Sequence, residues 1–351
     1  MKDFYAGKVI LVTGAAGTVG RELVRQLCEL EPAELRLLDN NESDTFFLME
    51  EYGSRNAVCF LGDVRDQYKV EKLAHGVDVI IHAAAFKHVI LSEYNPFDVV
   101  QTNVIGVENI IRAARACNVK HVIFTSSDKA VNPTNVMGTS KLLGERLITA
   151  ANAVRNSGST IFSSTRFGNV IGSRGSVVPL FVRQIRNGGP VTLTDRRMTR
   201  FIMTKEEAAR LVLESAAVAK GGEVFVTKMP VVNIPDLAEA LVEMLAPGYG
   251  YRPQDIGVVE IGAKPGEKFY EELMSDEEVH RSLELSRMFV VIPAFRAIYD
   301  SIQYEYSDVV SETVTQSYVS ATQPAMSKDD IKRYLADNRI IEIIEEGIYQ
   351  Q

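Results

Sequence analysis

Short, nearly all-apolar runs in the first half of the chain alternate with segments whose apolar residues recur at helical spacing. Apolar runs of this length are typical of parallel strands covered on both faces. Five strands are predicted, at residues 8–14, 34–39, 57–63, 77–85 and 120–127. Helices are predicted at 21–30, 43–53, 68–76 and 95–118, and another begins near Thr139. The alternation predicts an α/β fold with a Rossmann-type doubly wound parallel sheet.

The second half of the chain is less regular. Strands are predicted at 160–170 and 222–228, and helices at 180–188, 204–219 and 233–245. Strands and helices without clean alternation indicate a smaller α+β domain built from separate segments. We expect a first domain of residues 1–172 and 201–228, and a second of 173–200 and 229–351. Residues 303–323 have the weakest ordering signal.

The segment Thr13–Gly20, T-G-A-A-G-T-V-G, joins the first strand to the first helix. Its glycines allow a tight turn and a close approach of the backbone to phosphate, and the helix N-terminus supplies N–H groups. Because the segment opens a βαβ unit, we favour a dinucleotide site over a glycine-rich turn without a ligand. The residues assigned to this part of the site are Gly14, Gly17, Thr18, Val19 and Gly20.

A carboxylate at the end of the second strand indicates which dinucleotide is bound. Asp39 can accept hydrogen bonds from both adenosine ribose hydroxyls and would repel a 2′-phosphate, which favours NAD over NADP. The alternative is that Asp39 caps the next helix. Asp63 ends the third strand, where it could reach the adenine amine. The other residues assigned to NAD are Val64, Ala83, Ala84, Ala85 and Asn103.

The loop Thr125–Lys141 starts at the carboxyl end of the fifth strand, the edge that carries the ligand in open α/β sheets. It contains three consecutive groups able to move protons, Ser127, Asp128 and Lys129. On a loop these neighbours need not point in one direction, so all three could face one substrate. The alternative is a surface turn with an Asp–Lys pair, because charged turns are common.

Composition narrows the function classes. The net charge is −8, which argues against a nucleic-acid binder. The three cysteines, Cys28, Cys59 and Cys117, lie far apart in apolar stretches; we expect buried free thiols in a reducing compartment and neither a disulfide nor a zinc site. No apolar run is long enough for a membrane span, and the first strand leaves no room for a signal peptide. We therefore expect a cytoplasmic protein without a metal.

Six sequence blocks in order resemble the extended short-chain dehydrogenase/reductases, and more narrowly the UDP-GlcNAc 4,6-dehydratases of polysaccharide biosynthesis. The first block is the glycine segment, and the resemblance runs from about residue 7 to about 295. The others are H-A-A-A-F-K-H-V, S-S-D-K-A-V-N-P-T-N-V-M-G-T-S-K, R-F-G-N-V-I-G-S-R-G-S-V-V-P-L-F, M-T-R-F-I-M-T and K-P-G-E-K-F-Y-E-E-L. The resemblance implies an NAD-binding first domain and a substrate-binding second domain.

One position departs from the wider superfamily, which uses Y-x-x-x-K with tyrosine as the acid/base. Met137 stands where that tyrosine is expected, and methionine cannot transfer a proton. The only literal Y-x-x-x-K, Tyr68–Lys72, follows the third strand on the wrong edge of the sheet, and we interpret it as coincidence. The chain is similar in this respect to some members of the dehydratase subfamily, including membrane-anchored ones, which also have Met at the position of Met137. This chain lacks their membrane segment and resembles a soluble version.

The resemblance implies an internal redox reaction. Hydride leaves carbon 4 of the sugar for NAD, water is lost across carbons 5 and 6, and hydride returns to carbon 6. Asp128 is then the acid for the departing hydroxyl, which requires a carboxyl that keeps its proton near neutral pH. Lys129 is the base at carbon 5, and Ser127 binds or relays the proton of the carbon-4 hydroxyl. Lys141 holds the nicotinamide ribose, unless it is a solvated helix lysine.

The substrate assignments are looser. Candidates for contacts with the sugar, the diphosphate or the uracil are Lys87, Asn169, Arg174, Arg200, Glu267 and Lys268. Arg174 is as well interpreted as a solvated loop residue. The block around Met137 resembles the members that retain configuration at carbon 5, although some inverting ones share it.

Two other functions remain open. A UDP-sugar epimerase would bind NAD and a UDP-sugar without losing water, and the S-D-K triplet favours dehydration over it. A non-catalytic NAD(H) sensor would also lack the tyrosine, but Asp128 and Lys129 at the ligand edge argue against one. Relatives assemble through helices beside the sheet, so we expect a homo-oligomer, with residues 97–117 as a candidate interface.

Overall fold

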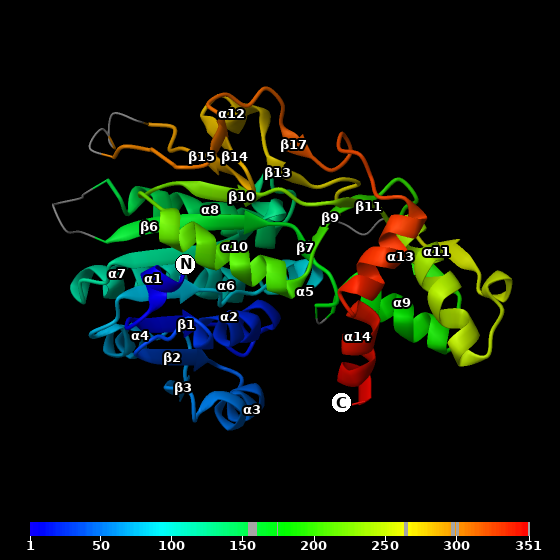
Figure 1. Ribbon diagram of the computed structural model, residues 1–351, viewed down its shortest axis with the longest axis horizontal. Helices are drawn as coiled ribbons and strands as arrows, with labels where there is room; N and C mark the ends of the chain where they lie inside the picture. The colour runs from blue at the N-terminus through cyan, green and yellow to red at the C-terminus, as the bar shows by residue number, and fades with distance from the viewer. Residues whose placement is uncertain (154–159, 174, 263–265, 296–298, 300–301, 350–351) are drawn as a thin grey trace. The chain divides into compact units, whose positions relative to one another are not determined.

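Ten strands form one sheet in the order β16-β14-β15-β10-β6-β5-β4-β1-β2-β3 (Figure 1). The seven from β3 to β10 are parallel, and β15, β14 and β16 extend the sheet with antiparallel pairing. The strands are β1 (Val9–Thr13), β2 (Glu34–Asp39), β3 (Ala57–Leu61), β4 (Val79–His82), β5 (His121–Ser127), β6 (Ile161–Phe167), β10 (Val224–Thr227), β14 (Ser282–Leu285), β15 (Met288–Val291) and β16 (Val309–Ser311). The order β3-β2-β1-β4-β5-β6 is that of a Rossmann fold, which confirms the predicted fold class.

This is a computed structural model that describes residues 1–351 except 154–159, 174, 263–265, 296–298, 300–301 and 350–351. The chain divides into two compact units. The first unit comprises Met1–Phe167, Glu206–Lys228 and Leu273–Ser317. The second comprises Gly168–Lys205, Met229–Glu272 and Tyr318–Gln351.

Helices cover both faces of the parallel sheet in the first unit. Helices α4, α7 and α8 bury apolar residues against one face, where Leu11, Ile80, Phe124 and Phe162 form part of one core cluster. Figure 1 shows α10 in front of the sheet and α8 behind it. The helices of this unit are α1 (Lys2–Tyr5), α2 (Thr18–Cys28), α3 (Glu42–Tyr52), α4 (Gln67–Ala74), α5 (Val89–Tyr94), α6 (Pro96–Val100), η1 (Gln101–Ile105), α7 (Gly106–Ala116), η2 (Asp128–Ala130), α8 (Val136–Ala150), α10 (Lys205–Val218) and α12 (Asp276–Val279).

Two predicted helices differ in detail from the structure. The helix predicted at 95–118 is α6 followed by the π-helical turn η1 and α7. The helix expected near Thr139 begins at Val136, because the Asn135 side chain caps it by accepting a hydrogen bond from Gly138 N at 2.8 Å. The loop that carries the candidate chemistry is therefore three residues shorter than expected.

The second unit has a core of its own, in which α9 and α11 pack with α13 and α14. Its helices are α9 (Val177–Arg186), α11 (Ile234–Leu245), η3 (Ala246–Tyr249), η4 (Pro253–Asp255), α13 (Lys328–Asp337) and α14 (Ile340–Tyr349). Its strands are β7 (Asn169–Val170), β8 (Val191–Leu193), β9 (Thr199–Met203), β11 (Val231–Asn233), β12 (Val258–Glu260) and β17 (Tyr318–Val319), and β13 (Glu272–Met274) lies at its border. Strands β11, β9 and β7 form one small sheet, and β12 pairs with β8.

Residues 273–317 belong to the first unit, whereas the sequence predicts them to be part of the second domain. Strands β14, β15 and β16 of this segment extend the large sheet of the first unit. The reason is that β15 pairs along β10, with Val224 opposite Val291 and Thr227 opposite Met288. The region expected to be least ordered, 303–323, contains the short strands β16 and β17.

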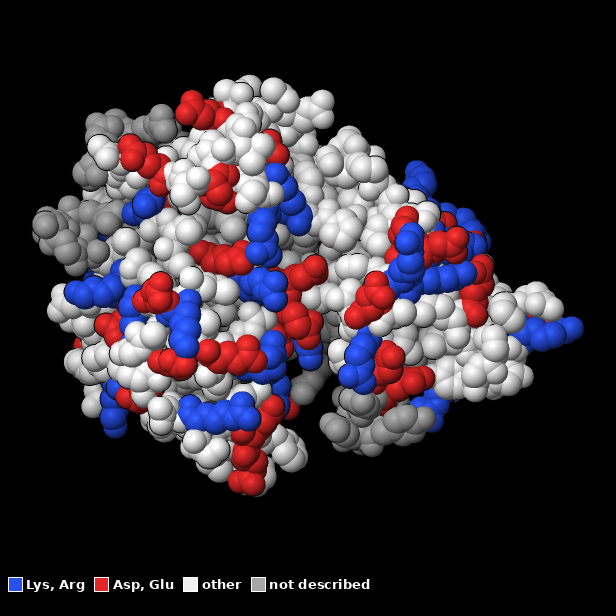
Figure 2. Space-filling model, in the orientation of Figure 1, with Lys and Arg blue, Asp and Glu red and all other residues white. Residues whose placement is uncertain are grey.

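Three further observations bear on the expectations from composition. Cys28, Cys59 and Cys117 are free thiols, but they are only partly buried rather than buried as expected. Within the described residues, no helix is both long and apolar enough to cross a membrane. Lys and Arg are interspersed with Asp and Glu on the face shown in Figure 2. In the second unit, for example, Lys328 of α13 pairs with Glu239 and Glu243 of α11 at 2.7 and 3.1 Å.

Candidate active site

The carboxyl ends of β1, β2, β4 and β5 lie at the same edge of the sheet because these strands are parallel. The last residues of these strands are Thr13, Asp39, His82 and Ser127. The glycine segment, the alanine run and the S-D-K triplet follow directly from them. The structure therefore brings the predicted cofactor and catalytic groups of the first unit to one edge.

The three glycines between β1 and α2 serve different purposes. Gly14 has φ +70°, and a Cβ there would lie 2.6 Å from Ala84 N. A Cβ at Gly20 would lie 2.0 Å from Gly14 O. A Cβ at Gly17, in contrast, would meet one protein atom within 4 Å, Gly14 O at 3.2 Å. Packing within the protein thus requires Gly14 and Gly20, whereas Gly17 leaves space beside the backbone.

That space suits a diphosphate. Helix α2 begins at Thr18, and Gly17 at its N-cap provides no side chain to bond the first helical amides, those of Thr18, Val19 and Gly20. Amide N–H groups at a helix N-terminus, together with the helix dipole, favour an anion. The residues present therefore fit the pyrophosphate of a dinucleotide.

Asp39 connects the glycine segment to the end of β2. Its carboxylate accepts hydrogen bonds from Ala16 N and Asn41 N, both at 3.0 Å. The alternative that Asp39 caps the next helix is wrong, because the cap of α3 is Asn41, which accepts from Asp44 N. Asp39 is partly exposed, and a carboxylate has further lone pairs for ribose hydroxyls.

Asp63 and Val64 are held in place by neighbouring side chains. Burial alone would raise the pKa of Asp63, but hydrogen bonds from Arg65 and Asn40 outweigh it and lower that pKa. Val64 is buried, and its carbonyl accepts a 2.9 Å hydrogen bond from Asn109 of α7. Asp63 therefore stays an acceptor, which is what contact with an adenine amine requires.

Asn103 positions the end of the alanine run. It lies in the π-helical turn η1 and is buried. Its side chain accepts from Phe86 N at 2.8 Å and donates to Phe86 O at 3.0 Å and to Ser140 Oγ at 2.9 Å. Ala83, Ala84 and Ala85 themselves are partly exposed. Asn103, predicted as a cofactor residue, thus links the alanine run to α8.

Asp128 lies at the centre of the predicted catalytic triplet. Its side chain is fully buried, whereas that of Lys129 is 23% exposed. Ser127 Oγ donates a 2.5 Å hydrogen bond to Asp128 Oδ1, and Lys129 Nζ lies 3.1 Å from the same oxygen. The Asp–Lys pair considered in the sequence analysis exists, but its carboxylate is not at the surface. Hydroxyl, carboxylate and amine converge on one atom and can exchange protons.

Lys141 is a buried cation and not a solvated helix lysine. Its Nζ donates to Thr125 O at 2.9 Å and lies 4.7 Å from the centroid of the Phe124 ring. Burial lowers the pKa of Lys141 to about 8, although Glu145 opposes the change. Met137, one turn earlier on α8, is 3% exposed. A Cβ at Gly138 would lie 2.2 Å from Lys129 O, so the glycine allows α8 to approach the triplet.

His82 is a site residue that the sequence analysis missed. Its Nδ1 is 2.7 Å from Thr13 Oγ1, and its ring stacks on Phe124. Burial, and secondarily the Lys141 ammonium, lower the pKa of His82 to about 3. A neutral His82 thus joins the ends of β1 and β4 close to Lys141. A polar residue directly after the apolar run V-I-I was the signal for it in the sequence.

The predicted substrate residues fall into separate groups. Lys87, in the first unit, is exposed. In the second unit Asn169 Oδ1 is buried without a partner among the described residues, so it can accept from a ligand. Arg174 lies outside the described residues.

Arg200 joins two of the predicted blocks within the second unit. It donates to Lys268 O at 2.9 Å and lies 3.5 Å from Glu271 Oε1, while Lys268 Nζ donates to Glu272 at 2.9 Å. Glu267 is partly buried. The Arg200 guanidinium thus connects the segment around Arg200 with residues 268–271.

Comparison with known proteins adds the context of a family. Residues 10–293 match the sequence model of a family described as polysaccharide biosynthesis protein. The chain belongs to this family of extended short-chain dehydrogenase/reductases. It is 52% identical over 293 residues to an uncharacterised membrane protein of Methanocaldococcus jannaschii, which covers 84% of this chain and 88% of that one.

Two relatives carry names of enzymes. An inverting UDP-N-acetylglucosamine 4,6-dehydratase of Campylobacter jejuni is 37% identical over 296 residues, 84% of this chain and 85% of that protein. A UDP-glucose 4-epimerase of Rickettsia massiliae is 33% identical over 335 residues, 94% of this chain and 96% of that protein. The polysaccharide biosynthesis family thus includes nucleotide-sugar dehydratases and epimerases among the relatives of this chain.

Solved structures agree with the fold. Pen from Bacillus thuringiensis has a TM-score of 0.88 and 39% identity, and the match covers 96% of this chain and 99% of that one. A dTDP-glucose 4,6-dehydratase from Streptomyces venezuelae, solved with NAD bound, has a TM-score of 0.66 and 23% identity over 74% of this chain and 86% of that one. This second likeness shows the Rossmann-type fold and not the substrate.

The acid/base position of this chain differs from the Y-x-x-x-K pattern expected of the wider superfamily. Met137 occupies the expected tyrosine position on α8 and is buried. Tyr68, which begins the coincidental Y-x-x-x-K, is 80% exposed on α4 after β3, the outermost strand. The Ser127–Lys129 triplet, at the end of β5, supplies groups that can transfer protons where methionine cannot.

Proposed function

We propose that this chain is an NAD-dependent UDP-N-acetylglucosamine 4,6-dehydratase that makes a 4-keto-6-deoxy sugar for a surface glycan. The observation that carries the proposal is the buried Asp128 carboxylate, contacted by both Ser127 Oγ and Lys129 Nζ at the ligand edge of the sheet. An epimerase has to move one proton at carbon 4. A dehydratase needs in addition an acid and a base for the loss of water, and the triplet supplies both.

The cofactor proposed is NAD, held by the residues of the first unit. Gly17 and the first amides of α2 would bind the pyrophosphate, and Asp39 the adenosine ribose. Asp63 would accept from the adenine amine, and Lys141 would donate to the nicotinamide ribose. NAD, when bound, accepts hydride from carbon 4 and returns it to carbon 6. Tight retention of NAD is part of the proposal.

Proton transfer begins at Ser127. When carbon 4 is oxidised, the proton of its hydroxyl passes to Ser127 Oγ while Ser127 gives its own proton to Asp128 Oδ1, along the 2.5 Å hydrogen bond. The carboxylate thereby becomes a carboxylic acid. In this mechanism Asp128 obtains the proton for the next step from the substrate itself.

Protonation of Asp128 prepares Lys129 to act as the base. It removes the negative charge that stabilised the ammonium 3.1 Å away. Lys129 is partly exposed and can release its proton to water. The free amine then takes the proton from carbon 5, while Asp128 gives its proton to the carbon-6 hydroxyl, which leaves as water. As hydride returns to carbon 6, the Lys129 ammonium gives a proton to carbon 5. Lys129 then regains from water the proton that it had released, which restores the ammonium and the carboxylate present at the start.

The first prediction concerns the reaction catalysed by the unmodified protein. UDP-GlcNAc in heavy water, with no cofactor added, is expected to lose one water and to gain one deuterium at carbon 5, because Lys129 exchanges its protons with solvent. Mass spectrometry and the carbon-5 proton signal measure both. A UDP-sugar of unchanged mass, with and without added NAD, would contradict the dehydratase proposal.

A parallel reaction in ordinary water, in which the product keeps a proton on carbon 5, determines the stereochemistry. Retention at carbon 5 is our prediction from the sequence resemblance, whereas the dehydratase relative from Campylobacter jejuni is named inverting. A nuclear Overhauser effect between the protons on carbons 3 and 5 is expected with retention and is lost with inversion. Inversion would overturn the stereochemical prediction and leave the dehydratase intact.

The second candidate is a UDP-sugar 4-epimerase, favoured by the named epimerase relative. It would use the same NAD site and the same Ser127 proton path. Its product would have the mass of the substrate and would carry no deuterium at carbon 5. The heavy-water experiment therefore separates the two functions.

A further inference from the structure

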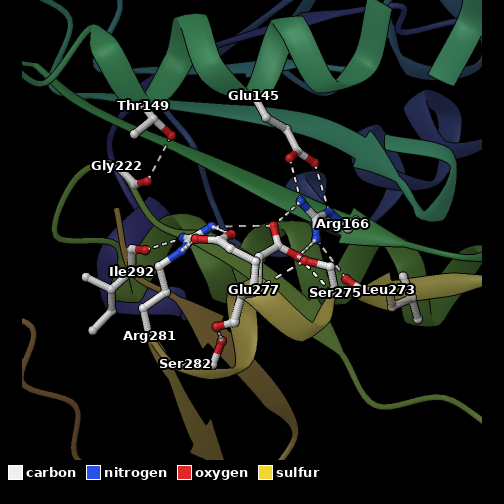
Figure 3. Close-up of polar contacts among 11 residues, drawn as sticks. Glu145, Thr149, Arg166, Gly222, Leu273, Ser275, Glu277, Arg281, Ser282 and Ile292 are labelled. Atoms are coloured by element: carbon white, nitrogen blue, oxygen red, sulfur yellow. Dashed lines mark hydrogen bonds and ion pairs between the residues drawn. The ribbon is translucent and has the colours of Figure 1, made fainter. Parts of the chain in front are cut away.

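Four buried charged groups lie between α8, β6 and α12, in the first unit. Arg166 of β6 donates from Nε and Nη2 to Glu145 of α8 at 3.0 and 2.6 Å. It also donates from Nη1 to Leu273 O at 2.8 Å (Figure 3). The same nitrogen donates to Glu278 of α12 at 3.0 Å. The side chains of Arg166, Glu145 and Glu278 are 1%, 3% and 6% exposed. The fourth group is Lys141, one turn before Glu145.

The two carboxylates differ in the cations beside them. Arg166 is a cation at any accessible pH. Although burial raises it, the Arg166 guanidinium lowers the pKa of Glu278 to about 2, and Arg281 Nη2 lies 3.8 Å from Glu278 Oε1 as a second cation. Glu145 is paired with Arg166 and lies one helical turn from Lys141.

Among the described residues no hydrogen bond or ion pair joins Glu145 directly to Lys141. The two residues are four apart on α8, so their side chains lie on the same helix face. The carboxylate of Glu145 is bound by Arg166, whereas Lys141 Nζ bonds Thr125 O. In the part of the chain that the structure describes, Lys141 forms no ion pair, so its remaining N–H groups can bind a ligand, while the Glu145 carboxylate one turn away favours its protonated form.

We propose that Glu145, held by Arg166, is a positioning residue that keeps the buried Lys141 in its cationic form during the reaction. The inference rests on the proposed function, in which the Lys141 ammonium binds the nicotinamide ribose and favours hydride acceptance. A fully buried lysine would otherwise lose its proton as a result of desolvation. Glu145 thereby sets the upper pH limit of the reaction.

The groups around Lys141 come from its own helix and from β4 and β5. The turn η2 also packs against α8 and carries the ion pair of Asp128 and Lys129. Neutral His82 of β4 and the Phe124 ring of β5 are on one side, with Thr125 O. Glu145 of its own helix is the charged group that favours the ammonium. Arg166 and Glu278 act on Glu145 from β6 and α12. Among these, Glu145 is the one whose removal changes the charge next to Lys141 most directly.

The test is a titration of Lys141 in the holoenzyme with lysine labelled with ¹³C at Cε, whose resonance is assigned by its loss in Lys141→Arg. In the wild-type protein the resonance is expected to titrate near pH 8. In Glu145→Gln we expect the pKa of Lys141 to fall by about one unit, since a neighbouring negative charge is lost. Turnover at pH 8 should then fall by about fivefold relative to its value on the acid side, because the ammonium fraction falls from a half to about a tenth.

Glu278→Gln is the matched control. It removes the same charge from the other side of Arg166, and Glu278 is not next to Lys141, so a clearly smaller change in the pKa of Lys141 is expected. Glu145→Asp restores a carboxylate and should recover most of the wild-type value. If Glu145→Gln does not fold, Glu145→Gln with Arg166→Gln is compared with Arg166→Gln alone. These two proteins differ only in the Glu145 charge, and the pKa of Lys141 is expected to be lower in the double variant by about one unit.

An unchanged titration of Lys141 in a folded Glu145→Gln protein would overturn the inference. So would an equal change in Glu278→Gln, because the effect would then be that of the net charge alone. The titration requires no turnover. A lowered pKa in a protein that loses no water from UDP-GlcNAc would uphold the role of Glu145 while contradicting the proposed function.

Discussion

Asp128→Asn is expected to reduce the rate of water loss about a thousandfold or more, the range typical of removing a positioned acid. Asparagine preserves the shape of the side chain and can still accept from Lys129 N, which donates to Asp128 Oδ1 at 2.9 Å. It cannot receive the proton that Ser127 passes on, nor give one to the leaving hydroxyl. Turnover is measured by mass spectrometry of the UDP-sugar, and bound NAD by release from the denatured protein.

The NAD content of Asp128→Asn should equal that of the wild type, because within the described residues the Asp128 carboxylate bonds Ser127 and Lys129, neither of which is assigned to the dinucleotide. Asp66→Asn is a suitable control, since asparagine also caps helices well and Asp66 caps α4 by accepting from Lys69 N. It is expected to leave turnover unchanged. Turnover of Asp128→Asn within tenfold of the wild type would show that Asp128 is not the acid.

Gly20→Ala should mainly lower the stability of the protein, whereas Gly17→Ala should mainly lower its affinity for NAD. A Cβ at Gly20 would lie 2.0 Å from Gly14 O and 2.9 Å from Ala15 C, both backbone atoms, so Gly20→Ala should destabilise the protein by about 3 kcal/mol or more. Gly17→Ala meets only Gly14 O, at 3.2 Å, and should lower the melting temperature by only a few degrees while reducing NAD affinity at least about tenfold.

Thermal unfolding and NAD titration of the two variants test this contrast. Gly248→Ala on η3 is the control, because a Cβ there has no neighbour within 4 Å, and it should change neither quantity. If Gly17→Ala bound NAD as well as the wild type, the pyrophosphate would not lie against Gly17. If it failed to fold, the space beside Gly17 would not be that of a ligand.

The parallel part of the sheet could be predicted from the sequence because each strand is a short apolar run followed by a helical segment. The antiparallel extension could not, because β14 and β16 have only four and three residues and no apolar run marks them. Helices α13 and α14 were not predicted, although the signal was present. Ser327 and Asp330 form a capping box at the start of α13, and Ile331 and Leu335 follow at helical spacing.

The positions of the candidate site could be predicted, but the contacts between its residues could not. The place of the triplet and of Lys141 could be predicted because both come after the end of β5. The contact of Ser127 and Lys129 with one oxygen of Asp128, in contrast, depends on the backbone of the turn η2. Arg166 is an example of a contact that the sequence does not predict. A charged residue inside a central strand indicates a buried partner, but Glu145 and Glu278 are 21 and 112 residues away along the chain.

The measurement that tests the central claim most directly uses UDP-GlcNAc deuterated at carbon 4, in ordinary water and without added cofactor. A 4,6-dehydratase transfers that deuterium within one molecule, so the product should have lost one water and should carry the label at carbon 6. A sugar that keeps its mass and has the label at carbon 4, with inverted configuration there, would identify an epimerase. A product without the label would contradict the internal transfer on which the account rests.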